Sequence, residues 1–254
     1  MYLTPSKTHE LMVILSPDKF DRNTEKPFLA LFEKPPVYVY PPHLTFPKIE
    51  NPLPHKDSVL LFEGGTDVNP ALYKQHLGKR TAMPDSVRDR HEERYFRLAQ
   101  EANAGCVGIC RGAQLLCVLS KGELIQDAKG HGQTHKLQLP DKFRRVILAA
   151  TSSHHQIMNP YVLPAKDWTS FGIAPDGVGY AYRDEYDNKI KVWKRWKNWE
   201  DQEIVWFKKT RSLSIQGHPE YFTDMNAQYV QYCRFLLHSL LLEKETSSND
   251  LPTP

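Results

Sequence analysis

A glycine-flanked cysteine is the residue of this chain best placed to do chemistry. Cys110 stands in the pentapeptide Gly108-Ile109-Cys110-Arg111-Gly112, between the apolar run 106–109 and an apolar helical stretch. The pattern predicts a buried strand that turns sharply into a helix, because the glycines remove Cβ atoms that would clash in such a turn. A helix start favours the thiolate, since unpaired N–H groups and the positive end of the dipole face the sulfur. The alternative is a core cysteine beside a tight turn.

A histidine and a glutamate late in the chain offer what a cysteine nucleophile needs. His218-Pro219-Glu220 follows an apolar segment and precedes a predicted long helix. Histidine takes the proton of the thiol, and a carboxylate holds the imidazole in its working tautomer. Pro219 stiffens the link between the two side chains. Alone, the tripeptide is typical of a surface turn, so its pairing with Cys110 is what predicts a site.

These residues resemble the triad of the class I glutamine amidotransferases, a cysteine in G-x-C-x-G with a histidine and a glutamate in H-P-E. The stretch from Glu63 to Tyr73 is similar to the G-G-x-D-V-x-P-x-x-Y segment of the γ-glutamyl hydrolase branch, which is peptidase C26 and includes γ-glutamyl-γ-aminobutyrate hydrolases. Further matches are Arg88-Asp89 with Glu92, the run 122–127, and Ser153-His154-His155-Gln156. Together the matches span roughly residues 58 to 221.

The resemblance implies a mechanism through a γ-glutamyl thioester on Cys110, with His218 protonating the leaving amine and Glu220 orienting His218. Two backbone N–H groups, those of Arg111 and Gly65, are expected to form the oxyanion hole. The glutamyl moiety is expected to bind at five positions: Asp67, Gln114, Ser153, His154 and His155. For these, the alternatives are a turn cap at Asp67, a solvated helix residue at Gln114, and an exposed loop at the paired histidines.

Composition and charge give no positive sign of a nucleic-acid-binding, membrane or zinc protein. The net charge of the 254 residues is +3, which demands neither nucleic acid nor a membrane surface. The four cysteines form no C-x-x-C pair and have no zinc-like spacing with histidine, so we expect no metal and no cofactor. No signal peptide and no apolar run of about 20 residues is apparent, so a reduced, cytoplasmic protein is expected.

Apolar runs at 11–15, 37–40, 59–62 and 106–109 alternate with longer mixed segments. This alternation predicts an α/β fold, and the resemblance specifies it as one flavodoxin-like amidotransferase domain over residues 1–245: a mostly parallel central sheet, flanking helices and an edge β-hairpin region. Ser86, with Asp89 three residues later, predicts the start of the helix before the nucleophile strand. Residues 246–254 are expected to be a disordered tail.

Residues 189–211 combine tryptophans with basic charge. Eight Lys and Arg stand against three acids, a local balance of +5. The interpretations are an extended hairpin whose tryptophans pack on the sheet, a surface that docks a protein partner, or, least favoured, a nucleic-acid surface. A further expectation is that Trp196 or Trp199 is exposed to solvent.

Three functions therefore remain open on the sequence. The first is a hydrolase that cleaves γ-glutamyl amides by itself. The second is the glutaminase subunit of a two-protein amidotransferase that passes ammonia to an ATP-dependent ligase, docked through residues 189–211. The third is a catalytically silent binding protein with this fold. The intact set of Cys110, His218 and Glu220 argues against the third function.

Overall fold

In the computed structural model, the described residues are 3–16, 24–41, 51–140, 146–175, 179, 181–196 and 198–243. The predicted tail, 246–254, lies outside them. The strands are β1 Glu10–Ile14, β2 Val37–Val39, β3 Ser58–Phe62, β4 Gly105–Ile109, β5 Glu123–Ile125, β6 Asp127–Lys129, β7 His135–Gln138, β8 Ile147–Ala150, β9 Ile157–Asn159, β10 Trp168–Ala174, β11 Ala181–Arg183, β12 Lys189–Ile190, β13 Asp201–Phe207 and β14 Ser212–Ile215. The α-helices are α1 Ser86–Glu101, α2 Arg111–Leu119, α3 Val192–Arg195 and α4 Ala227–Leu237, and α4 continues as a π-helical turn over His238–Leu242. Short 3-10 helices cover Leu29–Leu31, Pro70–Tyr73, Pro160–Val162, Ala165–Asp167 and Asp224–Asn226.

A central mixed sheet organises the molecule. Within the described residues its order is β2-β1-β3-β4-β14-β13-β10-β7-β8, with β9 pairing with β13 and β5 with β9. The pairs from β2 to β14 are parallel, whereas those from β14 to β8 are antiparallel. The α/β fold class predicted from the sequence is confirmed, and each of the four predicted early strands is present within one residue of its expected bounds.

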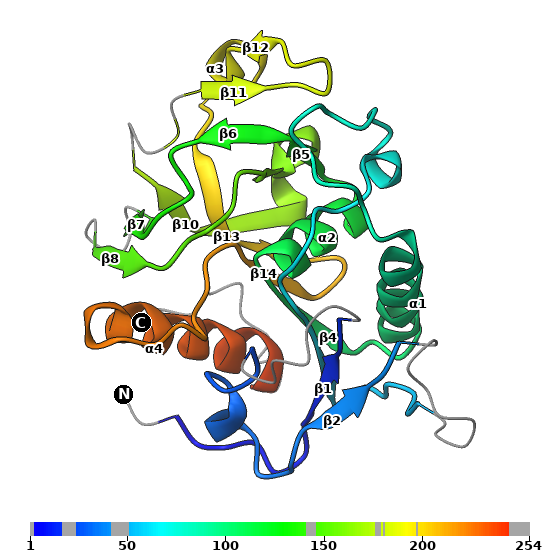
Figure 1. The fold of residues 1–254 in the computed structure, drawn as a ribbon. Coiled ribbons are helices and arrows are strands. Elements are labelled where there is room, and N and C mark those ends of the chain that lie inside the picture. The colour runs from blue at the N-terminus through cyan, green and yellow to red at the C-terminus, as the bar shows by residue number, and fades with distance from the viewer. Residues whose placement is uncertain are drawn as a thin grey trace.

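Helices cover both faces of the parallel part of the sheet, because successive strand residues point to opposite sides. Leu11, Val13 and Val107 pack with the residues of α4. Met12, Ile14 and Cys106 pack with those of α1 and α2. Figure 1 shows α4 on the opposite side of the sheet from α1 and α2. The carboxyl ends of β3, β4 and β14 therefore emerge at one edge between two covered faces, where ligand sites form in α/β proteins.

The start of α1 differs from the prediction by one residue. Asp85, not Ser86, caps the helix, and its carboxylate accepts hydrogen bonds from the N–H groups of Val87 and Arg88 at 2.9 and 3.0 Å. Asp89 does not take part in a cap, because it is buried and pairs with Arg111 instead. Three charged residues of α1 are buried: Arg88, Asp89 and Glu92. Asp89 and Glu92 contact Arg111, the residue that follows Cys110.

The tryptophan-rich segment forms a cap, not one extended hairpin. β12 pairs with β11 in a separate three-stranded sheet with β6, α3 follows, and β13 joins the central sheet. Figure 1 shows α3, β11 and β12 together beyond β6. Trp196 and Trp199 are half-buried, and their rings stack with centroids 5.1 Å apart. Both rings therefore keep part of their surface accessible to solvent, and the rest packs against the other ring and a small hydrophobic cluster.

Candidate active site

Cys110 occupies a strained backbone position between β4 and α2. Its φ and ψ are 50° and −107°, a conformation that non-glycine residues rarely adopt. The flanking glycines make the turn possible, since a Cβ at Gly108 would overlap the backbone of Gly112, and one at Gly112 would overlap the carbonyl of Phe62. The sharp strand-to-helix turn predicted from the pentapeptide is thus present, with the cysteine at its apex.

His218 and Glu220 lie where β14 ends, beside β4. The Nδ1 atom of His218 is 2.8 Å from a carboxylate oxygen of Glu220. Gly64 lies against both His218 and Cys110, because a Cβ built on it would be 3.4 Å from His218 Cε1 and 3.6 Å from Cys110 Cβ. Parallel pairing of β14 with β4 aligns Ile215 with Ile109, so both turns leave the sheet at the same level. The structure thus brings the three predicted triad residues together.

The protonated form of His218 is favoured. Burial by itself lowers the pKa of this imidazole, but its interactions with Cys110 and Glu220 outweigh the burial and raise the pKa to about 10. The ring also stacks on Tyr221, with centroids 4.9 Å apart, which fixes its plane. Burial disfavours the charged form of three other cysteines. It raises the pKa of Cys106 to about 12 and also raises the pKa values of Cys117 and Cys233. The raised pKa values disfavour the thiolate form of these three cysteines.

A buried ion network stands behind the nucleophile turn. The guanidinium of Arg111 bonds to the carboxylates of Asp89 and Glu92, and its Nε donates to the carbonyl of Thr66 at 3.1 Å. Arg88 donates to Glu92 at 2.9 Å and to the carbonyl of Gly64 at 2.9 Å. Two cations thus balance two anions, which is the arrangement that buried charges require. Sequence reasoning had assigned Arg111 only a backbone role.

Gly65 lines the same pocket as Cys110. Its φ is 144°, in the region that favours glycine, and a Cβ there would overlap the Arg88 guanidinium. Arg111 begins α2, so its N–H has no acceptor within the helix. The ion network fixes the loop and the helix that carry these two residues, and their part in an oxyanion hole stays a prediction.

One pocket of about 450 Å³ joins these groups. It is lined by Gly65, Thr66, Asp67, Ala82, Cys110, Gln114, Ser153, His154, His155, His218 and Tyr221. All the residues predicted to bind substrate therefore lie around one cavity. Sequence reasoning missed Thr66, Ala82 and Tyr221; Tyr221 directly follows the H-P-E tripeptide, a position that could have indicated it.

The predicted substrate-binding residues differ in what their polar atoms contact. Asp67 accepts from the N–H of Ala82 at 2.7 Å and lies 3.2 Å from His155 Nε2, so it both fixes a turn and faces the pocket. Ser153 Oγ lies 3.0 Å from His218 Nε2. Gln114 is buried, not solvated, and donates to the carbonyl of Gln156 at 3.2 Å.

His154 differs from its neighbour His155. Its Nδ1 lies 2.9 Å from the carbonyl oxygen of Gln156, and its Nε2 lies 3.5 Å from Glu203. Both ring nitrogens therefore face protein atoms, whereas the residue lines the pocket, and the expectation that His154 binds substrate stays a prediction. Glu203 also lies near His131 and His135, and the ligand atoms of these three residues are within 4.8 Å of one another. The spacing of four residues between the two histidines is the signal that sequence reasoning passed over.

Comparison with known proteins defines the class. The fold is that of class I glutamine amidotransferases: PurLQS from Thermotoga maritima is similar with a TM-score of 0.53 at 15% identity, over 89% of this chain and 97% of that one. The glutaminase domain of Trypanosoma brucei CTPS, solved with bound acivicin, is similar with a TM-score of 0.50 at 11% identity, over 89% and 92% of the two chains. At these identities the likeness concerns the fold.

The peptidase C26 profile matches residues 47–191, more than half of the sequence, and the chain belongs to this family. A glutamine amidotransferase-like protein of Lactococcus lactis subsp. cremoris, the YvdE homologue, is 39% identical over 41% of this chain and 55% of its own length. Protein NtpR of Enterococcus hirae is 30% identical over 47% of this chain and 57% of its own. The chain thus spans about half the length of these curated relatives. Within the described residues, no helix combines the length and apolar character needed to cross a membrane.

Proposed function

We propose that this chain is a cysteine hydrolase of γ-glutamyl amides, in which Cys110 is the nucleophile, His218 the proton carrier and Glu220 its orienting group. The observation that carries the proposal is the convergence of a strained cysteine and a carboxylate-paired histidine on one pocket at the carboxyl ends of neighbouring parallel strands. Membership of peptidase C26 and relatives named glutamine amidotransferase-like support the same chemistry.

The proposed reaction has two steps, acylation of Cys110 and hydrolysis of the resulting thioester. The thiolate of Cys110 attacks the δ-carbonyl carbon, a C–S bond forms, and the carbonyl electrons move to oxygen. The tetrahedral intermediate collapses, the C–N bond breaks, and Nε2 of His218 gives its proton to the departing amine. Water then attacks the thioester while His218 takes its proton, and free glutamate leaves as the thiolate is regenerated. The raised pKa of His218 suits the first step, because the proton is in place when the amine departs.

The N–H groups of Gly65 and Arg111 stabilise the negative oxygen of the intermediate in this mechanism. Gly65 lines the same pocket as Cys110, and Arg111 is the first residue of the helix that follows Cys110. Their backbone positions are fixed before substrate arrives, since Arg88 and Arg111 anchor the loop after β3 through the carbonyls of Gly64 and Thr66. Preorganised donors of this kind need no rearrangement as the charge develops.

The glutamyl moiety brings one ammonium and one carboxylate group to the pocket. Asp67 supplies a carboxylate for the ammonium, and His155 supplies a cation for the carboxylate, because hydrogen bonding to Asp67 raises the pKa of His155 against the effect of its burial. Gln114 lines the same wall, and Ser153 lies beside His218, where the leaving amine must pass. This arrangement favours a γ-glutamyl donor over a peptide that lacks the free α-groups.

The half-buried tryptophans bear on the alternative of an ammonia donor. Trp199 donates its indole N–H to Asp201 at 2.7 Å. Part of the aromatic surface of segment 189–211 therefore contacts this protein and is not available to a partner. We therefore expect the purified chain alone to release glutamate from γ-glutamyl-γ-aminobutyrate faster than from glutamine, measured by glutamate formation.

Two results would replace this proposal. If glutamate appears only after an ATP-dependent ligase is added, the chain is a glutaminase subunit. If neither γ-glutamyl amides nor glutamine are turned over under any condition, and a diazoketone analogue of glutamine leaves Cys110 unlabelled, the chain is a binding protein.

A further inference from the structure

A second buried cluster of histidines lies on the antiparallel side of the sheet and shares His154 with the lining of the pocket. Glu203 is on β13, His135 begins β7, His131 is in the loop before β7, and His154 follows β8. The side chains of all four residues are nine-tenths or more buried. Nδ1 of His131, Nε2 of His135 and Nε2 of His154 lie 3.0, 3.3 and 3.5 Å from the same oxygen of Glu203.

The outward nitrogen of each ring has a partner that accepts its proton. Nε2 of His131 is 2.9 Å from the carboxylate of Asp201, Nδ1 of His135 is 3.1 Å from the carbonyl of Gln133, and Nδ1 of His154 is 2.9 Å from the carbonyl of Gln156. Because a carbonyl or carboxylate oxygen can only accept, each ring can carry its proton on that outward nitrogen, which leaves the inward nitrogen able to act as a ligand. In that tautomer the inward nitrogens direct lone pairs toward Glu203.

The inward nitrogens share one neighbour, Oε1 of Glu203. Nδ1 of His131, Nε2 of His135 and Nε2 of His154 are buried and have no hydrogen-bond partner besides it among the described residues, and Oε2 of Glu203 has none there. Several lone pairs thus converge on a carboxylate in a dry interior, an arrangement that repels unless positive charge stands between them. One extra proton can bridge only one nitrogen and one oxygen. A bound cation satisfies all the converging atoms at once.

The donor set and its spacing fit a transition-metal ion. Imidazole nitrogen and carboxylate oxygen are ligands of Zn²⁺ at about 2.0–2.2 Å, which places neighbouring ligands of a tetrahedron roughly 3.3 Å apart. Nδ1 of His131 and Nε2 of His135 lie 3.0 and 3.3 Å from the same oxygen of Glu203, and the ligand atoms of the three residues are within 4.8 Å of one another. We propose that His131, His135 and Glu203 bind a divalent transition-metal ion of the zinc type.

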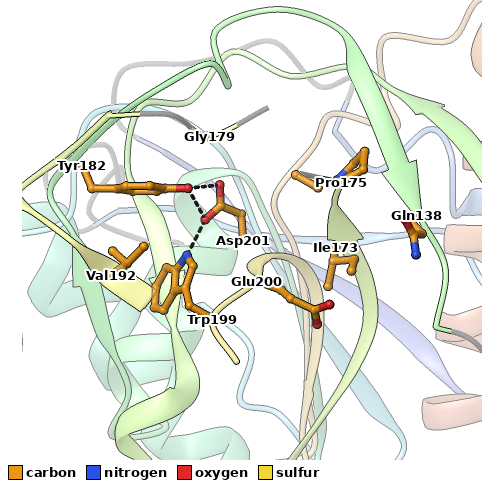
Figure 2. Close-up of a pocket in the computed structure, with 10 residues that line it drawn as sticks. Gln138, Ile173, Pro175, Gly179, Tyr182, Val192, Trp199, Glu200 and Asp201 are labelled. Carbon is orange, nitrogen blue, oxygen red and sulfur yellow. Dashed lines mark hydrogen bonds between the residues drawn. The ribbon is translucent and has the colours of Figure 1, made fainter. Parts of the chain in front are cut away.

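Asp201 is built as the orienting partner of this site. Its carboxylate accepts hydrogen bonds from the Tyr182 hydroxyl at 2.9 Å and from Trp199 Nε1 at 2.7 Å, in addition to its contact with His131. Figure 2 shows Tyr182 and Trp199 directed at Asp201, beside a hollow of about 350 Å³. Metal-bound histidines commonly donate their second N–H to such a carboxylate, which fixes the ring and its tautomer.

Two cavities adjoin the Glu203 cluster through His154. A hollow of about 610 Å³ borders it, lined by residues 127–130, 132–134 and 153–155. His154 is continuous with Ser153 and His155, which line the catalytic-site candidate. Because His154 lies against Glu203, an ion held by Glu203 also steadies the loop whose serine lies beside His218, and its role is structural, independent of which amide the pocket hydrolyses.

The test uses the full chain, purified without chelator, stripped with o-phenanthroline and titrated with Zn²⁺ and with Co²⁺. We expect one ion per chain by elemental analysis, the visible absorption of tetrahedral Co²⁺, and a higher Tm with Zn²⁺ than without. His135→Gln and Glu203→Gln should remove the cobalt spectrum, Asp201→Asn should weaken binding about 10–100-fold, and His55→Gln should change nothing. His55 is the matched control because it is an exposed histidine paired with Glu10.

Two outcomes overturn the proposal. The first is a wild-type chain that takes up neither ion and keeps the same Tm, which would leave the cluster a protonated network. The second is His135→Gln binding as tightly as the wild type. The wild-type titration and Tm shift need no variant, so they decide the matter even if Glu203→Gln fails to fold.

Discussion

Two histidine–carboxylate groups occupy opposite halves of one sheet and serve different ends. In the candidate active site, His218 and Glu220 stand at the carboxyl ends of parallel strands, and the second nitrogen of His218 faces an open pocket and a strained cysteine. In the Glu203 cluster, three histidines converge on one carboxylate among antiparallel strands, inside the protein. In the functions proposed above, the His218–Glu220 pair passes a proton on, whereas the Glu203 cluster holds a cation in place.

In both regions one ring nitrogen of each histidine is held by an acceptor, so the surroundings of the other ring nitrogen determine which chemistry is open to it. His218 has its Nδ1 fixed by Glu220 and its Nε2 beside a weak, replaceable partner, the hydroxyl of Ser153. His131 and His154 have their outward nitrogens fixed and their inward ones enclosed. Access of substrate to that second nitrogen, not the histidine–carboxylate pair itself, distinguishes the two regions.

Replacing Cys110 should produce the largest effect. We expect Cys110→Ala to lose about 10⁴-fold or more in rate, since the nucleophile is removed, and to lose labelling by a glutamine-derived diazoketone. Cys106→Ala is the control, because its buried thiol has a pKa raised to about 12 and should be unlabelled. Labelling of Cys106, Cys117 or Cys233 by mass spectrometry would end the assignment.

Next in size is the contrast between His218→Asn and Glu220→Gln. Loss of the proton carrier should cost about 10²–10⁴-fold in kcat/KM, and loss of the orienting carboxylate distinctly less. Steady-state kinetics on a γ-glutamyl amide measure both. Near-normal turnover in both variants would remove this tripeptide from the site and with it the comparison drawn above.

The ion network behind the nucleophile turn should matter to stability. Arg111→Met leaves Asp89 and Glu92 short of a buried partner, so we expect the free energy of unfolding to fall by about 3–5 kcal/mol. Arg97→Met is the matched control, because Arg97 pairs with Glu93 on the surface and should change stability by roughly 0–1 kcal/mol. Urea unfolding at one pH compares them, and equal losses would contradict the network's importance.

A smaller effect should depend on pH. The pKa of His218 rises on folding from about 6.5 to about 10, so its proton stabilises the folded state fully below pH 6.5, and this stabilisation is lost as pH rises through 10. The stability difference between wild type and His218→Gln should therefore shrink over that window. A difference that stays constant from pH 6 to about 10 would show that the imidazolium is not held by Cys110 and Glu220.

The smallest expected effect concerns the tryptophan cap. Trp196→Ala should leave the rate of γ-glutamyl hydrolysis within about twofold, because the ring packs on Trp199 and lies outside the lining of the pocket. Iodide quenching should report partial protection of this ring in the wild type. A large loss of rate in this variant would mean that the cap, and through it Asp201, communicates with the pocket.

The sequence by itself determined the parts of this protein that depend on neighbours along the chain. The glycines around Cys110 predict its turn, and the clash that Gly108 avoids, with the backbone of Gly112, lies within five residues. The clash that Gly112 avoids, with the carbonyl of Phe62, is between distant segments. The tripeptide 218–220 predicts the histidine–carboxylate contact, because one proline separates the partners. The early strands followed from apolar runs long enough to be buried on both faces.

Tertiary structure alone decided the contacts between distant segments. Arg111 meets Asp89, 22 positions away, and His131 meets Asp201, 70 positions away. The adjacent residues His154 and His155 face Glu203 and Asp67 respectively, and no pattern at two neighbouring positions says which one turns inward. The physical reason is that burial and strand pairing, not residue type, determine which polar atoms lose water and must find a partner in the protein.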